Sequence, residues 1–149
     1  MIESPLEQHL GYWLRLVSNA VSNAFARALA ERQISVAEWV VLNHVGNRNS
    51  ATSSAIAAAI GMTRGAVSKI LDKLESKGLV VRVASTEDSR VQILSLTRQA
   101  RRLLPKLTAI ADGNDDHFFS VLDRAEQDTL RALLQKLADL HQIRDIPLE

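Results

Sequence analysis

The feature that most restricts the fold is a very short interval between two segments of helical periodicity. Apolar side chains recur with helical spacing in residues 53–60 and again in residues 64–76, and little more than Gly61 and Met62 separates the two segments. Thr52 and Thr63 have side chains that cap helix N-termini, and a glycine commonly ends a helix. Two helices joined through so tight a glycine turn are typical of the helix-turn-helix motif.

Behind the second of these helices, the apolar period changes from that of a helix to that of a strand. Gly78 ends the helical pattern, residues 79–83 and 91–96 have strand character, and the polar segment 86–90 lies between them. This arrangement predicts a β-hairpin, the wing. The expected fold is therefore mainly α with a small β-hairpin wing (α+β), a winged helix-turn-helix.

Capping signatures predict two helices before this motif. Ser4, Pro5 and Glu7 predict that a long helix begins at Pro5, with Ser4 as its cap and Glu7 closing a capping box. Ser35 and Glu38 repeat the capping box and predict a second helix of about three turns. The long helix carries an apolar stripe, so it is expected to need a partner along one side.

Two more helices are expected after the wing. Thr97 is predicted to cap a helix that continues past Gly113 to Leu122, with Pro105 and Gly113 as positions where it bends. Asp123 is predicted to start the last helix, which has leucines at core spacing.

The total formal charge of +1 conceals a polarised distribution. Residues 61–106 carry ten Lys/Arg and four Asp/Glu, whereas the rest of the chain carries eight and thirteen. A basic segment of this kind suits contact with phosphates, joined to a part that does not make such contact. Ordinary solvated charge is the alternative explanation of the same residues.

The helix at 64–76 is expected to turn its apolar arc inward and to leave a polar face outward. Arg64 is expected to contact guanine edges and Ser68 to contact base edges or phosphate, while Gly65 lets the backbone approach closely. Arg90 at the hairpin tip is expected to enter the minor groove, oriented by Asp88. The DNA-binding candidates are Ser53, Ser54, Thr63, Arg64, Gly65, Ser68, Lys69, Lys73, Arg82, Asp88, Ser89 and Arg90.

Composition and motifs argue against several other chemistries. Cys is absent, so the chain has no disulfide, thiolate zinc site or cysteine redox sensor. No phosphate-cradling glycine loop or nucleophile elbow stands out, so neither enzyme activity nor a cofactor is expected. Asp115, Asp116 and His117 could attract a divalent ion, but a solvated cluster is favoured and no metal site is expected. No apolar run is long enough to span a bilayer, so a cytoplasmic protein without a membrane partner is expected.

Several short motifs accompany this order of elements: Trp39-Val40-Val41-Leu42, Ile56-Ala57, Ile60-Gly61-Met62-Thr63, Ala66-Val67-Ser68, Leu71-Asp72-Lys73-Leu74, Lys77-Gly78-Leu79-Val80, Asp88-Ser89-Arg90 and Leu96-Thr97. Together the motifs and the order of the elements resemble the MarR family of winged helix-turn-helix transcriptional regulators over nearly the whole chain. The wing departs from the family's more basic pattern, because Arg82 and Arg90 alone flank its turn, and a modest wing affinity is expected.

The resemblance implies a homodimer whose N- and C-terminal helices intertwine. Residues 1–34 would be the N-terminal dimerisation helix, 35–97 the winged helix-turn-helix DNA-binding domain, and 98–149 the C-terminal dimerisation helices. The function implied is sequence-specific binding of double-stranded DNA at a pseudo-palindromic operator, as a repressor. Release by a small aromatic or phenolic effector is also implied, and the candidate pocket walls are Trp13, Arg15, Trp39 and His44.

Two alternatives stay open at this point. Trp13 and Trp39 have the helical spacing of ordinary core residues, and Arg15 fits a solvated or paired side chain as well as a ligand clamp. The alternative function is a winged helix that binds another protein and not DNA. Such a module would not respond to replacement of Arg64 or Arg90 by alanine.

Overall fold

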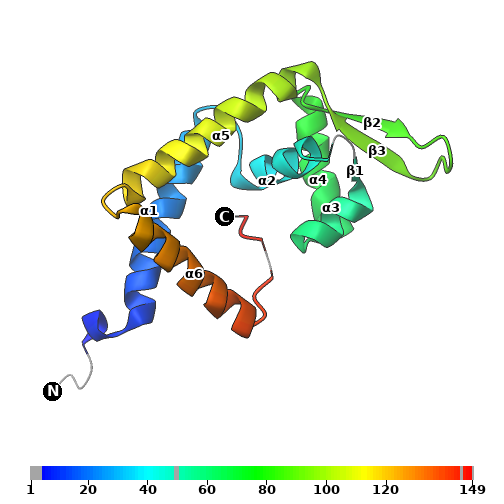
Figure 1. The fold of residues 1–149 in the computed structure, drawn as a ribbon. Coiled ribbons are helices and arrows are strands. Elements are labelled where there is room, and N and C mark those ends of the chain that lie inside the picture. Colours follow the sequence, from blue (N-terminus) through cyan, green and yellow to red (C-terminus); the bar gives the residue numbers. More distant parts are fainter. Residues whose placement is uncertain (1–4, 49–50, 145, 149) are drawn as a thin grey trace.

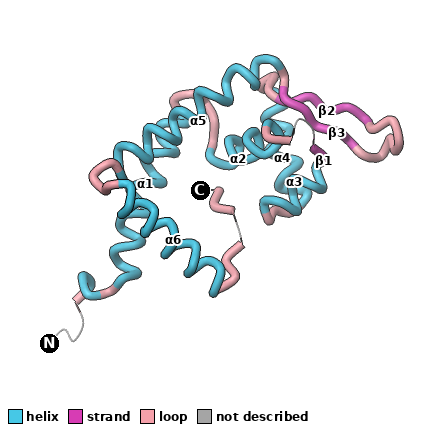
Figure 2. The backbone as a smooth tube through the Cα atoms, in the orientation of Figure 1, coloured by secondary structure: helices cyan, strands magenta, loops and turns pink. Residues whose placement is uncertain are grey.

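The computed structural model describes residues 5–48, 51–144 and 146–148. Within these residues the chain forms a 3-10 turn, six α-helices and one three-stranded sheet (Figures 1 and 2). In chain order the elements are η1 (Leu6–Gln8), α1 (Leu10–Ala30), α2 (Val36–Gly46), β1 (Ala51–Thr52), α3 (Ser53–Ile60), α4 (Arg64–Ser76), β2 (Val80–Ala84), β3 (Gln92–Leu96), α5 (Arg98–Phe119) and α6 (Arg124–Leu140).

The predicted helix-turn-helix is confirmed in α3 and α4, and its polar side chains fix both helix starts. The Thr52 hydroxyl accepts a hydrogen bond from the Ala55 amide, and the Thr63 hydroxyl accepts one from the Ala66 amide, both at 3.1 Å. Gly61 has a φ of 71°, the left-handed conformation that glycine adopts without strain. The chain can therefore leave α3 and enter α4 within a single tight turn.

The predicted hairpin is also confirmed, as β2 and β3. Arg82 lies opposite Leu94, and Val83 lies opposite Ile93. The sheet has a third strand that the sequence does not predict: β1 pairs with the other edge of β3, which gives the order β1-β3-β2. A strand of two residues is too short to show a period, so no pattern indicates it.

One buried cluster joins the end of α1, α2, α3, α4, the sheet and the first half of α5. We call α2, α3, α4 and the sheet the winged helix. The apolar arc predicted for α4 is confirmed, because Val67, Leu71 and Leu74 have no exposed surface. The largest fully buried side chains are Leu29, Val41, Leu42, Val45, Ile56, Ile60, Val67, Leu71, Leu74, Leu94 and Leu107.

The remaining helices form an arm, which we define as α1, α5 and α6. α1 and α5 lie side by side, and α6 follows the C-terminal end of α5 after a short turn (Figure 1). The side-chain amide of Asn114 in α5 donates to the carbonyl of Val21 in α1 at 3.1 Å. All 17 residues of α6 are described, and none of them is buried. The arm therefore leaves much apolar surface outside the core.

The start of the first helix differs from the prediction. The helix expected to begin at Pro5 begins at Leu10, after the turn η1. The indole of Trp13 donates to the carbonyl of Glu7 at 2.8 Å, and a continuous helix would need that carbonyl for the amide four residues later. Ser4, the predicted cap, lies outside the described residues.

The end of α5 differs as well. The helix passes through Pro105 and Gly113 as predicted but stops at Phe119, so Leu122 lies in the turn before α6. The side-chain amide of Gln127 donates to the carbonyls of Phe119 and Leu122, at 2.9 and 3.1 Å. These bonds satisfy carbonyls at the helix end and hold the turn.

The other predicted helix starts are confirmed. Ser35 and Glu38 form a reciprocal capping box at α2, with hydrogen bonds of 3.0 and 3.1 Å. Thr97 caps α5, and Asp123 with Glu126 forms a second capping box at α6. Each cap satisfies amides that have no partner inside the helix.

Candidate nucleic-acid interface

α4 presents a polar face to solvent above its buried arc. Its thirteen residues give a length of about 20 Å, and the diameter of an α-helix fits the major groove of DNA. The exposed side of the helix carries hydrogen-bonding and cationic groups together with one glycine, where the backbone itself is accessible. These exposed residues, all predicted as DNA-binding candidates, are Arg64, Gly65, Ser68, Lys69 and Lys73.

Three further candidates lie at helix starts. Thr63 is exposed, but its hydroxyl is engaged as the cap of α4. Ser53 is half-buried and Ser54 is exposed in the first turn of α3. The first turn of a helix has free amides that commonly contact phosphates. The structure therefore gives Thr63 a structural task and leaves Ser54 accessible.

The wing tip holds Arg90 in a defined orientation. Its Nε donates to Asp88 Oδ1 at 3.1 Å, its Nη2 donates to Oδ2 at 3.2 Å, and its amide donates to Oδ1 at 3.0 Å. The side-chain hydrogen bond from Arg90, followed by the backbone one, lowers the pKa of Asp88. The Arg90 side chain is 88% exposed, and Ser89 beside it is exposed too. The predicted pairing of Asp88 with Arg90 is confirmed.

Arg82, the other wing arginine, points toward the protein. Its Nη2 lies 2.7 Å from Asp72 Oδ1 and 3.4 Å from the Ser68 carbonyl, and its Nε lies 3.7 Å from Glu75 Oε2. The side chain is 17% exposed. Arg82 was expected beside the wing turn as a DNA contact, but the structure holds its guanidinium between the hairpin and α4.

The four residues predicted as effector-pocket walls do not line one cavity. Trp13 lines a groove between α1 and α6, and Arg15 lines a shallow depression next to η1. Trp39 packs edge-to-face on Phe25, with ring centroids 5.2 Å apart, which is the core packing that its spacing also allowed. His44 is buried in α2, and burial lowers its pKa, which favours the neutral imidazole.

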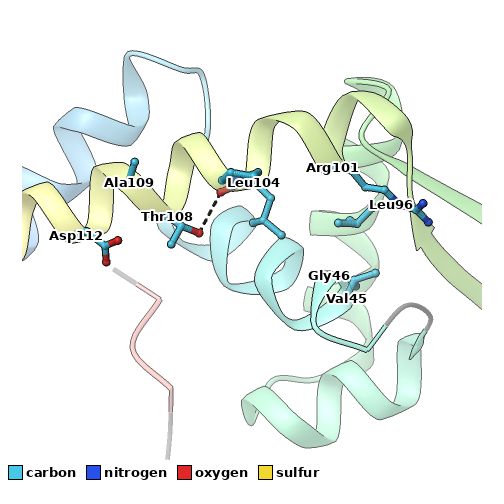
Figure 3. Close-up of a pocket in the computed structure, with 9 residues that line it drawn as sticks. Val45, Gly46, Leu96, Arg101, Leu104, Thr108, Ala109 and Asp112 are labelled. Atoms are coloured by element: carbon cyan, nitrogen blue, oxygen red, sulfur yellow. Dashed lines mark hydrogen bonds between the residues drawn. The ribbon is translucent and has the colours of Figure 1, made fainter.

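A different cavity lies between α2 and α5 (Figure 3). It has a volume of about 570 Å³. Arg101 lies at one end of its α5 wall and Asp112 at the other, with Leu104, Thr108 and Ala109 between them. Its walls are formed by Val45, Gly46, Leu96, Arg101, Leu104, Pro105, Thr108, Ala109 and Asp112.

A pattern of non-aromatic residues in the sequence indicates this cavity. Arg101, Leu104, Thr108 and Asp112 recur every three or four residues, so they share one face of α5. A face that mixes ionisable and apolar groups is unusual for a helix packed in a core. Such a face indicates a cavity or a groove.

Two other predicted properties concern metals and membranes. Asp115, Asp116 and His117 are each exposed on α5, and the described part of the chain brings no three metal-binding side chains together. Across the ranges that the structure describes, no helix combines the length and the apolar character needed to cross a bilayer.

The helix-turn-helix, the polar face of its second helix and the hairpin that follows define a winged helix-turn-helix protein. The sequence model of the MarR family matches residues 32–91, which run from the end of α1 to the wing tip. Over this segment the chain is similar to the MarR family of winged helix-turn-helix transcriptional regulators.

Known proteins share this fold along nearly the whole chain. The transcriptional repressor CouR, solved with a 23-mer DNA duplex, is 29% identical with a TM-score of 0.81, and the match covers 93% of this chain and 98% of CouR. CouR from Rhodococcus jostii RHA1, solved with p-coumaroyl-CoA, is 26% identical with a TM-score of 0.76, covering 91% and 96% of the two chains. The HTH-type transcriptional repressor Mb2911 from Mycobacterium bovis is 27% identical over 128 residues, which are 86% of this chain and 92% of the relative.

Proposed function

We propose that this protein is a repressor that binds a specific site on double-stranded DNA as a homodimer. The observation that carries the proposal is the exposed face of α4, where Arg64 and Ser68 lie free of the core, next to a wing whose Arg90 is oriented by Asp88. A helix with such a face reads base edges in the major groove, and an arginine on a projecting hairpin suits the adjacent minor groove. The repressor role is supported by CouR and Mb2911, which are both named transcriptional repressors.

The arm supports a two-fold assembly. The groove between α1 and α6 has a volume of about 820 Å³ and a mostly apolar lining. Leu133, Leu134 and Leu137 on α6 are 54%, 42% and 49% exposed. A helix with an apolar stripe and no buried residue is not stabilised by packing, so this stripe needs the same helices of a second copy. Two copies would then present two α4 helices to half-sites about 34 Å apart.

The effector proposed for this regulator is an aromatic acid or its thioester, bound in the cavity between α2 and α5. The apolar side chains of Val45, Leu96 and Leu104 suit an aromatic ring, and the guanidinium of Arg101 suits a carboxylate or a phosphate. CouR with p-coumaroyl-CoA supports this ligand class. Titration of the protein–DNA complex with aromatic acids and their thioesters tests this proposal, because an effector should release the DNA.

Selection from random duplexes, followed by affinity measurements at two salt concentrations, tests the DNA-binding proposal. The wild-type protein is expected to enrich an inverted repeat and to bind it less tightly as salt increases. Arg64→Ala and Arg90→Ala are each expected to weaken binding roughly 10- to 100-fold, because each removes an arginine from the DNA-contacting surface. Arg144→Ala serves as the control, since Arg144 is exposed beyond α6 and should not affect the affinity.

The same experiment distinguishes the alternative, a winged helix that binds a protein. That module would enrich no sequence, and neither arginine variant would change its binding of nonspecific duplex beyond the effect of one surface charge. Absence of an enriched inverted repeat with a folded, dimeric sample would contradict the proposed function.

A further inference from the structure

We propose that Arg82 is a positioning residue that fixes the wing to α4 and neutralises carboxylates on that helix, and that it does not itself contact DNA. The inference rests on the proposed DNA-binding function. It concerns how the two DNA-contacting parts, α4 and the wing tip, keep a fixed relative position.

Strand alternation places Arg82 on the inner face of the hairpin. Val80, two residues earlier on the same face, is 2% exposed, and Leu94, the partner of Arg82 across the strands, is 0% exposed. Val81 and Val83 point to the other face and are 42% and 57% exposed. A cation on the inner face loses much of its hydration, so it needs acceptors from the protein.

α4 supplies these acceptors along one of its faces. Ser68, Asp72 and Glu75 are four and three residues apart, so they lie in a row on the helix surface. Arg82 reaches all three, at 3.4 Å to the Ser68 carbonyl, 2.7 Å to the Asp72 carboxylate and 3.7 Å to the Glu75 carboxylate. The guanidinium therefore joins the wing to three positions of α4.

The charge of α4 gives this contact a second effect. The Asp72 and Glu75 side chains are 65% and 51% exposed on the helix that is proposed to enter the groove. Unpaired carboxylates there would repel the phosphates of DNA. Arg82 offsets this repulsion from within the protein, because its side chain is 17% exposed and its guanidinium lies against both carboxylates.

The two possible roles of Arg82 predict opposite signs for Asp72→Ala. If Arg82 is a positioning residue, Asp72→Ala and Arg82→Ala should each weaken operator binding, roughly tenfold, because loss of the fixed wing position outweighs the removal of one carboxylate. If Arg82 instead contacts a phosphate, Asp72→Ala frees its guanidinium for that contact and strengthens binding. Glu87→Ala is the matched control, because it removes an exposed carboxylate at the wing tip.

A double variant and the salt dependence sharpen the test. Arg82→Ala with Asp72→Ala should bind no more weakly than Arg82→Ala alone, because the two residues act as one unit. Arg82→Ala should keep the wild-type slope of affinity against salt, whereas loss of a phosphate contact lowers that slope by about one. Tighter binding by Asp72→Ala, or a slope reduced by about one in Arg82→Ala, overturns the proposal.

A measurement without DNA separates this inference from the proposed function. Hydrogen exchange of the β2 and β3 amides should accelerate in Arg82→Ala and in Asp72→Ala, while the amides of α6 stay unchanged. Unchanged exchange in the hairpin overturns the positioning role even if DNA binding is established. If Arg82→Ala fails to fold, Arg82→Lys takes its place, because lysine keeps the charge and loses the two-pronged contact.

Discussion

In the winged helix, Ile56, Leu71 and Leu94 are 0% exposed, whereas Leu10 and Leu140 in the arm are 88% and 72% exposed. Burial of apolar surface stabilises a fold by about 25 cal/mol per Å². The winged helix obtains this stabilisation from its own chain, and the arm obtains it only in part. The two regions should therefore respond differently to mutation. Changes in the winged helix should alter the stability of the protomer, and changes in the arm should alter assembly.

The largest effect is expected from charges placed on the apolar stripe of α6. The double variant Leu133→Asp with Leu137→Asp should separate the protomers and weaken operator binding by at least about 100-fold, because each half-site would then bind one copy independently. Light scattering coupled to gel filtration reports the mass, and titration of the selected operator reports the affinity.

A matched control for this variant lies on the opposite side of the same helix. Ala132→Asp adds the same type of charge at an exposed position of α6 and should leave both mass and affinity unchanged. If the double leucine variant stays dimeric, or if its winged helix unfolds together with the arm, the two regions do not respond separately and the prediction is wrong.

The next effect in size belongs to the core of the winged helix. Leu71→Ala leaves a cavity beneath α4 and should lower the free energy of unfolding by about 2–5 kcal/mol. Urea unfolding of the protein measures this loss, and Val81→Ala, at a position that is 42% exposed, should cost less than about 1 kcal/mol. Dissociation of Leu71→Ala without loss of stability would contradict the prediction.

The smallest effect is expected at the junction of the two regions, where Lys77 at the end of α4 meets the segment between α1 and α2. Lys77 Nζ lies 2.8 Å from Glu38 Oε2 and 2.6 Å from the carbonyl of Gln33. Burial raises the pKa of Glu38, but the hydrogen bonds from Lys77 and Ser35 and the charge of Lys77 outweigh it and hold the pKa below the ordinary value.

The lowered pKa of Glu38 determines how the stability of the fold changes with pH. Because the folded-state pKa of Glu38 is below the unfolded one, the carboxylate stabilises the fold fully above the ordinary glutamate pKa of about 4.3 and loses this effect as the pH falls through the folded-state pKa. Glu38→Gln should therefore cost about 1–2 kcal/mol near neutral pH and less in acid. Unfolding of both proteins across pH measures the difference, and a difference that does not change with pH would refute this account.

Helix starts were predictable from the sequence because a cap is a local feature. Thr52, Thr63 and Asp123 each bond an amide three residues along, and the pattern of residue types is sufficient to recognise this. The start of α1 was predicted wrongly because the Trp13 indole takes the Glu7 carbonyl. A side-chain contact of this kind depends on geometry that no capping pattern contains.

The candidate site likewise contains some residues that the sequence could predict and others that it could not. Exposure of Arg64 and Arg90 follows from helical and hairpin periodicity, so these residues could be placed in advance. The inward direction of Arg82 was contained in its alternation with Val80, but its partner Asp72 is defined only by the packing of the hairpin on α4. The cavity between α2 and α5 depends on contacts between residues far apart in the sequence.

One of those contacts joins Gly46 in α2 and Leu104 in α5. A Cβ at Gly46 would lie 2.6 Å from Leu104 Cδ2, so a side chain at this position would require that methyl group to move. The φ of Gly46 is not in the left-handed region, and the sequence therefore marks it only as a helix stop. The close approach is a tertiary property that a single sequence does not display.

The junction at Lys77 also has a mechanical consequence. Arg64 lies at the opposite end of α4, about 20 Å away at 1.5 Å per residue, so a tilt of about 5° with Lys77 as the fulcrum displaces Arg64 by about 1.7 Å. α4 is thus anchored at this end by Gln33 and Glu38. A tilt about this anchor would move most the end that is proposed to touch the bases, and two-fold symmetry would apply the displacement twice.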